Sequence, residues 1–190
     1  MVEVYDNIFS QEQLLEIEDY TLKLPYTCTN TADGGIKREK SGKLVNKHIF
    51  FGSCLFSREN INKISVYEEN SDFAFYLFEK IQESIQKKYY LTQISVNLQH
   101  PGCNGHPHTD GPSERHKTIM LMTNCYWEEQ WGGKFQIISH GGDVMDEYDY
   151  VPGRVLIFPG NQPHRGLGAK IEFPFAYRTT LVFRTEPLIF

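Results

Sequence analysis

Residues 105–111 read Gly-His-Pro-His-Thr-Asp-Gly, and the rest of the chain can be interpreted outward from this stretch. On an extended strand, side chains two residues apart point to the same side, so His108 and Asp110 can reach one metal ion together. Gly105 and Gly111 bracket the run, which is typical of backbone that bends close to a ligand. The stretch therefore predicts two ligands of a metal site that needs a third.

The third ligand is expected at His164. Residues 162–166 read Gln-Pro-His-Arg-Gly and follow an apolar strand candidate and a Pro-Gly turn, which places His164 at the start of another strand. Two histidines and one carboxylate form the facial triad of non-haem Fe(II) oxygenases, which leaves coordination positions open for substrates and oxygen. A His-x-Asp pair alone is a weak signal, because both residue types are common at strand ends and turns.

The composition sets bounds on the class of protein. The 190 residues, 40% of them hydrophobic, are enough for one sizeable core, so we expect a single domain over residues 1–190. The formal net charge of -5 gives no general basic footprint, and we expect neither general nucleic-acid binding nor membrane binding. The acidic start of the chain and the lack of a long apolar segment predict a cytoplasmic protein. With no Cys-x-x-Cys pair, reduced thiols are expected at Cys28, Cys54, Cys103 and Cys125.

Two amphipathic helices are expected within residues 1–90. Ser10 and Gln13 resemble a capping box, and apolar residues then recur at helical spacing until Pro25. A second helix is expected to begin with Ser71 as its N-cap and to end at Lys87, whose charge favours the C-terminal end of the helix dipole. We predict that these helices support a sheet formed by later residues.

Residues 27–47 lie between two well-patterned segments and contain the turn-forming pairs Gly34-Gly35 and Ser41-Gly42 and a run of basic residues. The interval predicts a hairpin or loop, and it is a candidate lid over a reactive site. Lys37 and Arg38 within it are candidate contacts to an acidic substrate, and a simple solvated loop is the alternative.

From Tyr90 the period changes to two, which predicts a strand with one polar face formed by Gln93, Ser95, Asn97 and Gln99. That face lines a wet cavity or faces solvent, and the pattern leaves both open. Further strands are expected over residues 48–56, 117–123, 134–138, 154–158 and 177–184, separated by turn-forming residues. The acidic residues within 143–149 predict a solvated loop. Together the strands predict an antiparallel jelly-roll.

The last strand places Arg178 and Thr180 on one face. An arginine buried on a strand is costly unless it is paired. Its planar fork suits a dicarboxylic acid whose other end binds the metal, and Thr180 adds a hydroxyl.

In order and spacing, several motifs resemble the Fe(II)/2-oxoglutarate-dependent dioxygenases, in the branch similar to prolyl 4-hydroxylases. The resemblance spans about residues 91–184. It rests on His108-Thr109-Asp110, Trp131-Gly132-Gly133-Lys134-Phe135, Pro152-Gly153-Arg154-Val155-Leu156-Ile157-Phe158, His164 and Arg178-Thr179-Thr180-Leu181-Val182-Phe183.

The resemblance implies a mainly β fold, a double-stranded β-helix (jelly-roll) core with the N-terminal helices packed outside. It implies that His108, Asp110 and His164 are the iron ligands and catalytic centre, and that Arg178 binds the distal carboxylate of 2-oxoglutarate. The implied reaction consumes O2 and 2-oxoglutarate, releases succinate and CO2, and hydroxylates a peptide or protein side chain, such as proline, or a small molecule. Because Asp110 supplies a carboxylate, hydroxylation is favoured over halogenation, and desaturation stays open.

The chain departs from the family where it carries Met120-Leu121-Met122 in place of tyrosines, one of which contacts the cosubstrate in many relatives. Asn97, Gln99 and Tyr126 are the candidate replacements. Because the interval from His164 to Arg178 is long, Arg184 on the same strand face is a second candidate for the cosubstrate arginine. Candidate substrate contacts are His106, Tyr126 and Trp131.

Two other classes of protein stay open. A non-oxidative, cupin-like jelly-roll, such as an isomerase or sugar-binding module, uses the same metal ligands but has no need of Arg178 with Thr180. A structural domain with core histidines leaves the ordered motifs unexplained. The oligomeric state cannot be read from the sequence.

Overall fold

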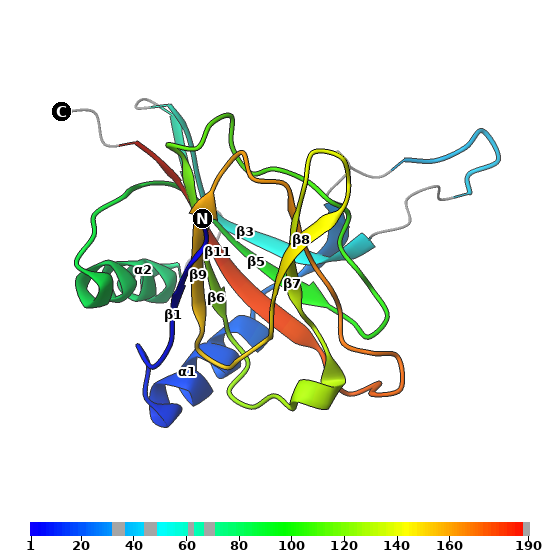
Figure 1. Ribbon diagram of the computed structural model, residues 1–190, viewed down its shortest axis with the longest axis horizontal. Coiled ribbons are helices and arrows are strands. Elements are labelled where there is room, and N and C mark those ends of the chain that lie inside the picture. Colours follow the sequence, from blue (N-terminus) through cyan, green and yellow to red (C-terminus); the bar gives the residue numbers. More distant parts are fainter. Residues whose placement is uncertain (32–36, 44–48, 61–62, 67–70, 188–190) are drawn as a thin grey trace.

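An eight-stranded antiparallel sheet runs through the middle of the protein, with both helices on one side and a three-stranded sheet on the other (Figure 1). The computed structural model describes residues 1–31, 37–43, 49–60, 63–66 and 71–187. The elements are β1 (Glu3–Tyr5), α1 (Gln11–Leu22), β2 (Thr27–Thr31), β3 (Ile49–Asn60), β4 (Lys63–Val66), α2 (Asp72–Ile85), β5 (Tyr90–Gln99), β6 (Lys117–Met122), the 3-10 turn η1 (Glu129–Trp131), β7 (Phe135–Ile138), β8 (Val144–Tyr148), β9 (Val155–Pro159), β10 (His164–Gly166) and β11 (Arg178–Glu186).

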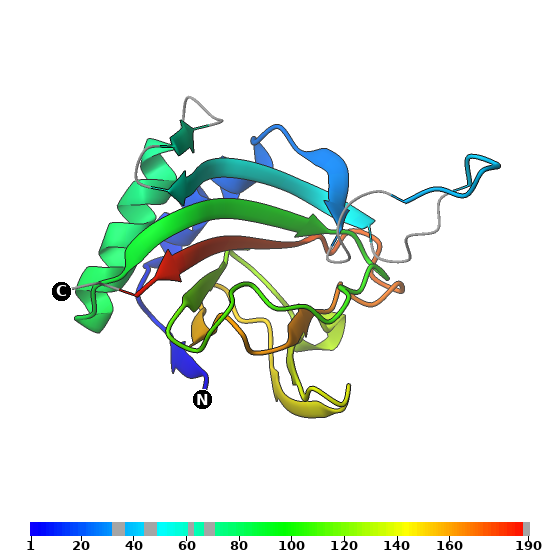
Figure 2. The same cartoon turned by 90° about the horizontal axis from the view of Figure 1, so that it is seen from above.

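The order of strands is that of two facing sheets. The large sheet runs β1-β9-β6-β11-β5-β3-β2, with β4 also paired to β3, and the small sheet runs β10-β7-β8. Within the large sheet, Thr180 of β11 lies opposite Asn97 of β5 and Met122 of β6. Figure 2, turned to look from above, shows β3, β5 and β11 curving side by side. The predicted mainly β, jelly-roll architecture with helices outside is confirmed.

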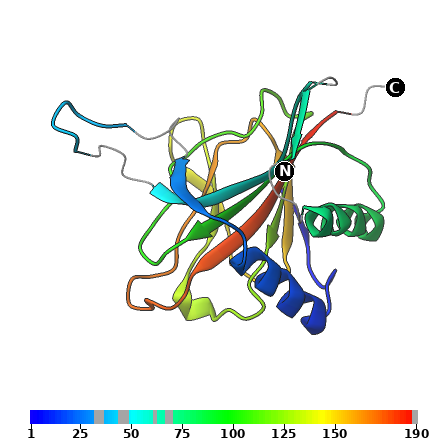
Figure 3. The same ribbon diagram turned by 180° about the vertical axis from the view of Figure 1, so that it is seen from behind.

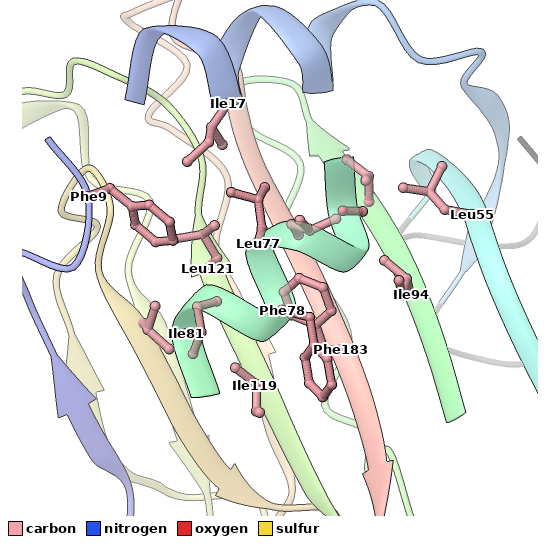
Figure 4. Close-up of a cluster of buried hydrophobic side chains, with 14 of the residues drawn as sticks. Phe9, Ile17, Leu55, Leu77, Phe78, Ile81, Ile94, Ile119, Leu121 and Phe183 are labelled. Carbon is pink, nitrogen blue, oxygen red and sulfur yellow. The ribbon is translucent and has the colours of Figure 1, made fainter. Parts of the chain in front are cut away.

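The two faces of the large sheet differ because side chains alternate along each strand. Phe183 of β11 packs against Phe78 of α2 (Figure 4), and Leu181 joins the same core. Val182 points the other way and joins a second core between the two sheets. The second core also contains Met120 and Met122, the residues that stand where many relatives of the resembled family carry tyrosines.

Both helices form where their sequence predicts, and Figure 3 shows them from behind. The capping box before α1 is present, since the Ser10 hydroxyl accepts from the Gln13 amide and the Gln13 side chain accepts from the Ser10 amide. Ser71 occupies the predicted N-cap position of α2. It is buried with helical backbone angles, however, and its side chain makes no capping hydrogen bond.

Two segments differ from their predicted local structure. The acidic residues 143–149 include strand β8 and not only a loop, because backbone pairing with β7 tolerates exposed acidic side chains at the edge of the small sheet. His108 makes only an isolated bridge to His164, and residues 105–111 are otherwise not strand. Thr27–Thr31 form strand β2 on the edge of the large sheet and pair antiparallel with β3, which fits the hairpin and not the loop alternative for this interval.

Candidate metal centre and cosubstrate cavity

A cavity of about 500 Å³ lies against the inner face of the large sheet. The polar face of β5 lines it, so the wet-cavity interpretation of that strand is the correct one. The even-numbered residues of β11 line the same cavity, with His108, Asp110 and His164 at its wall. The β5 and β11 lining residues are Gln93, Ser95, Asn97, Gln99, Arg178, Thr180, Val182 and Arg184.

The three predicted metal ligands converge at this wall. One ligand atom from each of His108, Asp110 and His164 lies within 4.8 Å of the others. Nε2 of His164 is 3.4 Å from Asp110 Oδ2, and Nε2 of His108 is 3.7 Å from Asp110 Oδ1. Backbone bonds hold the segments together: the amides of His108 and His164 each donate to the other's carbonyl, at 3.0 and 2.9 Å.

Both imidazoles are held in the form that a metal needs. His108 Nδ1 lies 2.8 Å from the carbonyl of His106, and His164 Nδ1 lies 2.9 Å from the carbonyl of Gln162. Since a carbonyl only accepts, each Nδ1 carries the proton and each Nε2 keeps a free electron pair. Burial, together with the neighbouring His164, lowers the pKa of His108, which favours the neutral ligand form.

Asp110 is fixed through both of its oxygens. Oδ1 accepts a hydrogen bond from Arg184 Nη2 at 2.5 Å, and Oδ2 accepts one from the Thr118 hydroxyl at 2.9 Å. Burial alone would raise the pKa of this carboxyl, but the close approach of His164 and the charge of Arg184 hold the pKa below its usual range. Asp110 is thus ionised at neutral pH. The sequence analysis predicted neither the hydrogen bond from Thr118 to Asp110 nor the pairing of Arg184 with Asp110.

Arg178 is fully buried at the other end of the cavity, with 2% of its surface exposed. Its Nε donates to the Gly133 carbonyl at 2.9 Å, and Nη1 donates to Gln99 Oε1 at 2.7 Å. Its Nη2 has no hydrogen-bond partner among the described residues. Burial lowers the pKa of Arg178 to about 10, so the group is still charged at neutral pH. A buried cation without an acidic partner is costly, and a ligand carboxylate would complete it.

An aromatic ring supports Arg178 from behind. Its guanidinium carbon lies 5.1 Å from the ring centroid of Tyr150. The Tyr150 hydroxyl donates toward Asn124 Oδ1 and the Thr179 carbonyl, both at 2.6 Å. Tyr150 lies just beyond β8 and outside every segment for which the sequence analysis made a prediction, and no local pattern signalled its role.

The other predicted site residues divide into two groups. Asn97, Gln99 and Thr180 line the cavity, and the amide of Gln99 also donates to the carbonyls of Cys103 and Gly166. Gln99 is therefore the polar side chain that positions Arg178. The second group lies outside the lining: among the described residues, His106, Tyr126, Trp131, Lys37 and Arg38 do not line the cavity.

The residues of the second group make other contacts or are exposed away from the cavity. The exposed His106 ring is 2.8 Å from the Pro107 carbonyl, and only its backbone serves the site, through His108. Tyr126 is 61% exposed and its ring packs against Trp131, with centroids 5.7 Å apart. Lys37 and Arg38 are exposed in residues 37–43, which project away from the sheets (Figure 1). The described parts of residues 27–47 meet the cavity at Thr27.

In the described residues, no helix is long and apolar enough to cross a membrane. All four cysteines are free thiols.

Comparison with known proteins identifies the fold. A scan against protein-family models found none that matches, and a search of curated proteins found no match. Solved structures do match. A 2OG-Fe(II) oxygenase family oxidoreductase from Burkholderia pseudomallei is 14% identical, with a TM-score of 0.69 over 97% of this chain and 85% of that one. The chain has the fold of the 2-oxoglutarate/Fe(II) oxygenases.

Two prolyl hydroxylases share the fold. The prolyl-4-hydroxylase of Pseudomonas putida is 14% identical, with a TM-score of 0.60 over 97% of this chain and 92% of that one. A prolyl hydroxylase from Trichoplax adhaerens, solved with a peptide fragment of the hypoxia inducible factor oxygen degradation domain, is 16% identical with a TM-score of 0.60. That match covers 97% of this chain and 83% of that one.

Proposed function

We propose that the protein is an Fe(II)- and 2-oxoglutarate-dependent dioxygenase. It hydroxylates a peptide side chain, such as proline, or a small molecule, and it releases succinate and CO2. The observation that carries the proposal is Arg178, a buried guanidinium with an unpartnered Nη2 that lines the same cavity as a His-Asp-His triad. The two features match the two ends of a metal-chelating dicarboxylate.

Arg178 also separates this proposal from a cupin-like metal protein. A metal site alone needs the triad, and it gains nothing from a buried cation beyond it. Arg178 has neutral partners, Gly133 and Gln99, and burying its charge is unfavourable until an anion arrives. A dicarboxylate cosubstrate supplies that anion.

The residues present fit both groups. His108, Asp110 and His164 would hold Fe(II), which with O2 supplies the oxidising chemistry when bound. Arg178 would receive the distal carboxylate, with Thr180 beside it. Thr118 and Arg184 each donate to one oxygen of Asp110 and so fix the orientation of the carboxylate that would bind the metal. Phe158 and Phe135 pack beside the His164 ring, with centroids 4.6 and 5.4 Å away, and exclude water from that side.

Three further features belong to the same proposal. The chain forms a single domain over residues 1–190, and the protein works in the cytoplasm. Of the predicted lid, residues 27–31 belong to the sheet, and residues 37–43 beyond them bring Lys37 and Arg38 to the substrate. The peptide bound by the Trichoplax prolyl hydroxylase supports a peptide among the candidate substrates, since the two chains share a fold. Four free thiols are compatible with a reducing compartment.

Succinate release tests the proposal. The protein is incubated in air with Fe(II), ascorbate and 2-oxoglutarate, and succinate is measured by NMR, first alone and then with a panel of proline-containing peptides and free amino acids. We expect slow succinate release that a substrate stimulates and that disappears in Asp110→Ala. Release that is equal in the protein and in Asp110→Ala would reject the proposal.

A further inference from the structure

A second arginine lies at the metal end of the cavity. Arg184 lines the cavity from the same face of β11 as Arg178, because their residue numbers differ by six and side chains an even number of positions apart share a face. At about 3.4 Å per residue, their backbone positions are about 20 Å apart. The five-carbon 2-oxoglutarate is much shorter than that. If Arg178 receives its distal carboxylate, as the proposed function requires, Arg184 is left beyond the metal and toward the substrate.

The hydrogen bonds of Arg184 leave room for a further ligand. Its Nη2 donates to Asp110 and its Nη1 donates to Gln93 Oε1 at 2.9 Å, and each of these nitrogens has a second N–H group. The Nε is buried and has no partner among the described residues. A guanidinium carries five N–H groups, so the two side-chain partners engage only part of it. The Arg184 side chain is 37% exposed and Asp110 is 4% exposed, so the arginine stays accessible from the cavity.

Counting charges shows why a ligand at Arg184 should be acidic. Among the described lining residues, Asp110 is the only acid, and Arg178 and Arg184 are the two permanent cations. Fe(II) and the dianion of 2-oxoglutarate cancel each other, and the histidine ligands are neutral. A cavity with Arg178 alone would then be neutral, whereas Arg184 adds one positive charge. That extra charge attracts an anion.

We infer that Arg184 receives an acidic group of the substrate, with the neighbouring polar side chains Gln93 and Ser95 of β5 beside it. The inference rests on the proposed function and narrows it: the substrate carries a carboxylate close to the carbon that reacts. The carboxylate belongs to an acidic side chain, a peptide C-terminus or a free acid, which share the same chemistry.

The test uses a small carboxylate and its neutral amide. The protein is loaded with Zn(II) and N-oxalylglycine, an unreactive analogue of 2-oxoglutarate, and fluorine NMR measures the binding of trifluoroacetate and trifluoroacetamide. We expect trifluoroacetate to bind and trifluoroacetamide not to bind. Because charge-assisted hydrogen bonds are lost, Arg184→Gln should weaken trifluoroacetate about tenfold or more, and Arg184→Lys should restore part of the binding. The matched control is Arg165→Gln, which removes an arginine outside the lining.

Several outcomes would overturn the inference. Equal binding of trifluoroacetamide and trifluoroacetate to the wild-type protein would overturn it, and this result needs no variant. A loss of trifluoroacetate binding in Arg178→Gln but not in Arg184→Gln would place the probe at the cosubstrate end. Binding of N-oxalylglycine is measured first by calorimetry, and its absence would reject the proposed function and not the acid site. The two probes are then compared in the metal-free protein, where Arg184 still lines the cavity.

Discussion

The two ends of the cavity carry the same residue type in opposite surroundings. Arg178 is fully buried and has only neutral partners, whereas Arg184 is partly exposed and is paired with the carboxylate of Asp110. At one end none of the described residues supplies a counter-charge, so the arginine is prepared for the charge of a ligand. At the other end the arginine first positions Asp110, a proposed metal ligand. The difference teaches that the partners of a buried cation, more than its position on a strand, indicate its role.

Backbone geometry explains how the Arg178 end is closed. Gly133 has a φ of 78°, in the region that favours glycine, and its carbonyl accepts from Arg178. A Cβ at this position would lie 2.8 Å from the Trp127 ring and 3.4 Å from Arg178. Only glycine lets the backbone just before β7 come this close to the buried guanidinium of Arg178.

The largest effect is expected from the metal ligands that lie between the two arginines. Asp110→Ala or His164→Ala should abolish turnover and weaken Fe(II) binding by at least about a hundredfold, since changes outside the ligand set alone cost about 10- to 100-fold. Metal affinity by calorimetry under anaerobic conditions checks this. His106→Ala is the matched control, because it removes an exposed histidine near the same loop. Equal Fe(II) affinity in His164→Ala and His106→Ala would contradict the assigned triad.

The next largest effect distinguishes the role of Arg178 in cosubstrate binding from that of Arg184. Arg178→Leu should raise the Kd of 2-oxoglutarate by about 30- to 5000-fold, because losing one partner of a buried charge pair costs roughly 2 to 5 kcal/mol. Fe(II) affinity should change little. The five-carbon 2-oxopentanoate, which lacks the distal carboxylate, should bind the variant and the wild type equally.

Arg184→Leu reverses the pattern in our account, with weaker metal binding and a smaller effect on 2-oxoglutarate in the metal-loaded protein. A normal Kd for 2-oxoglutarate in Arg178→Leu, together with a large loss in Arg184→Leu, would transfer the cosubstrate role to Arg184.

The sequence predicts well which residues of β5 and β11 face the cavity and which side chains converge near it. Alternation along β11 and β5 is a local property, so it placed Arg178, Thr180, Asn97 and Gln99 on one face. The convergence of His108, Asp110 and His164 was predictable because residue type and spacing marked them as candidate metal ligands. Even so, the spacing argument assumed a strand at residues 105–111, and the convergence actually comes from a loop bridged to β10.

The rest of the site depends on contacts between distant segments. The pairs of Asp110 with Arg184 and Thr118, and of Arg178 with Gly133 and Tyr150, follow from strand register and from the packing of one sheet on the other. No local pattern contains that information. Strand β8 was missed for a related reason, since its acidic side chains favour a loop and only its partner β7 makes it a strand.

A smaller effect is expected behind Arg178. Tyr150→Leu removes the ring under the guanidinium and should weaken 2-oxoglutarate by about 2- to 30-fold, from the roughly 0.5 to 2 kcal/mol of a cation–π contact. Tyr150→Phe keeps the ring and should retain most of that affinity, while losing about 1 to 3 kcal/mol of stability with its buried hydroxyl bonds. Calorimetry with 2-oxoglutarate and urea unfolding read the two effects separately. Equal cosubstrate affinity in all three proteins would remove Tyr150 from the site.

The smallest effect concerns the loss of folding stability at low pH, to which Asp110 contributes at the Arg184 end of the cavity. The pKa of Asp110 is lowered in the folded protein, so its contribution is present above the unfolded pKa, near 4, and is lost as the pH falls through the lower folded value. In the presence of EDTA, urea midpoints of the wild type should therefore fall more steeply below pH 4 than those of Asp110→Asn. Parallel curves for the two proteins would show that the Arg184 pair does not stabilise the charged form.

One measurement tests most directly the central claim that the triad and Arg178 together hold a metal-chelated dicarboxylate. Under anaerobic conditions, the Fe(II)-loaded protein is titrated with 2-oxoglutarate while the visible spectrum is recorded. Our account predicts a charge-transfer band that saturates at one 2-oxoglutarate per protein, and that needs far more 2-oxoglutarate in Arg178→Leu at unchanged iron content. Full iron binding with no band at saturating 2-oxoglutarate, or the same titration curve in Arg178→Leu, would contradict it.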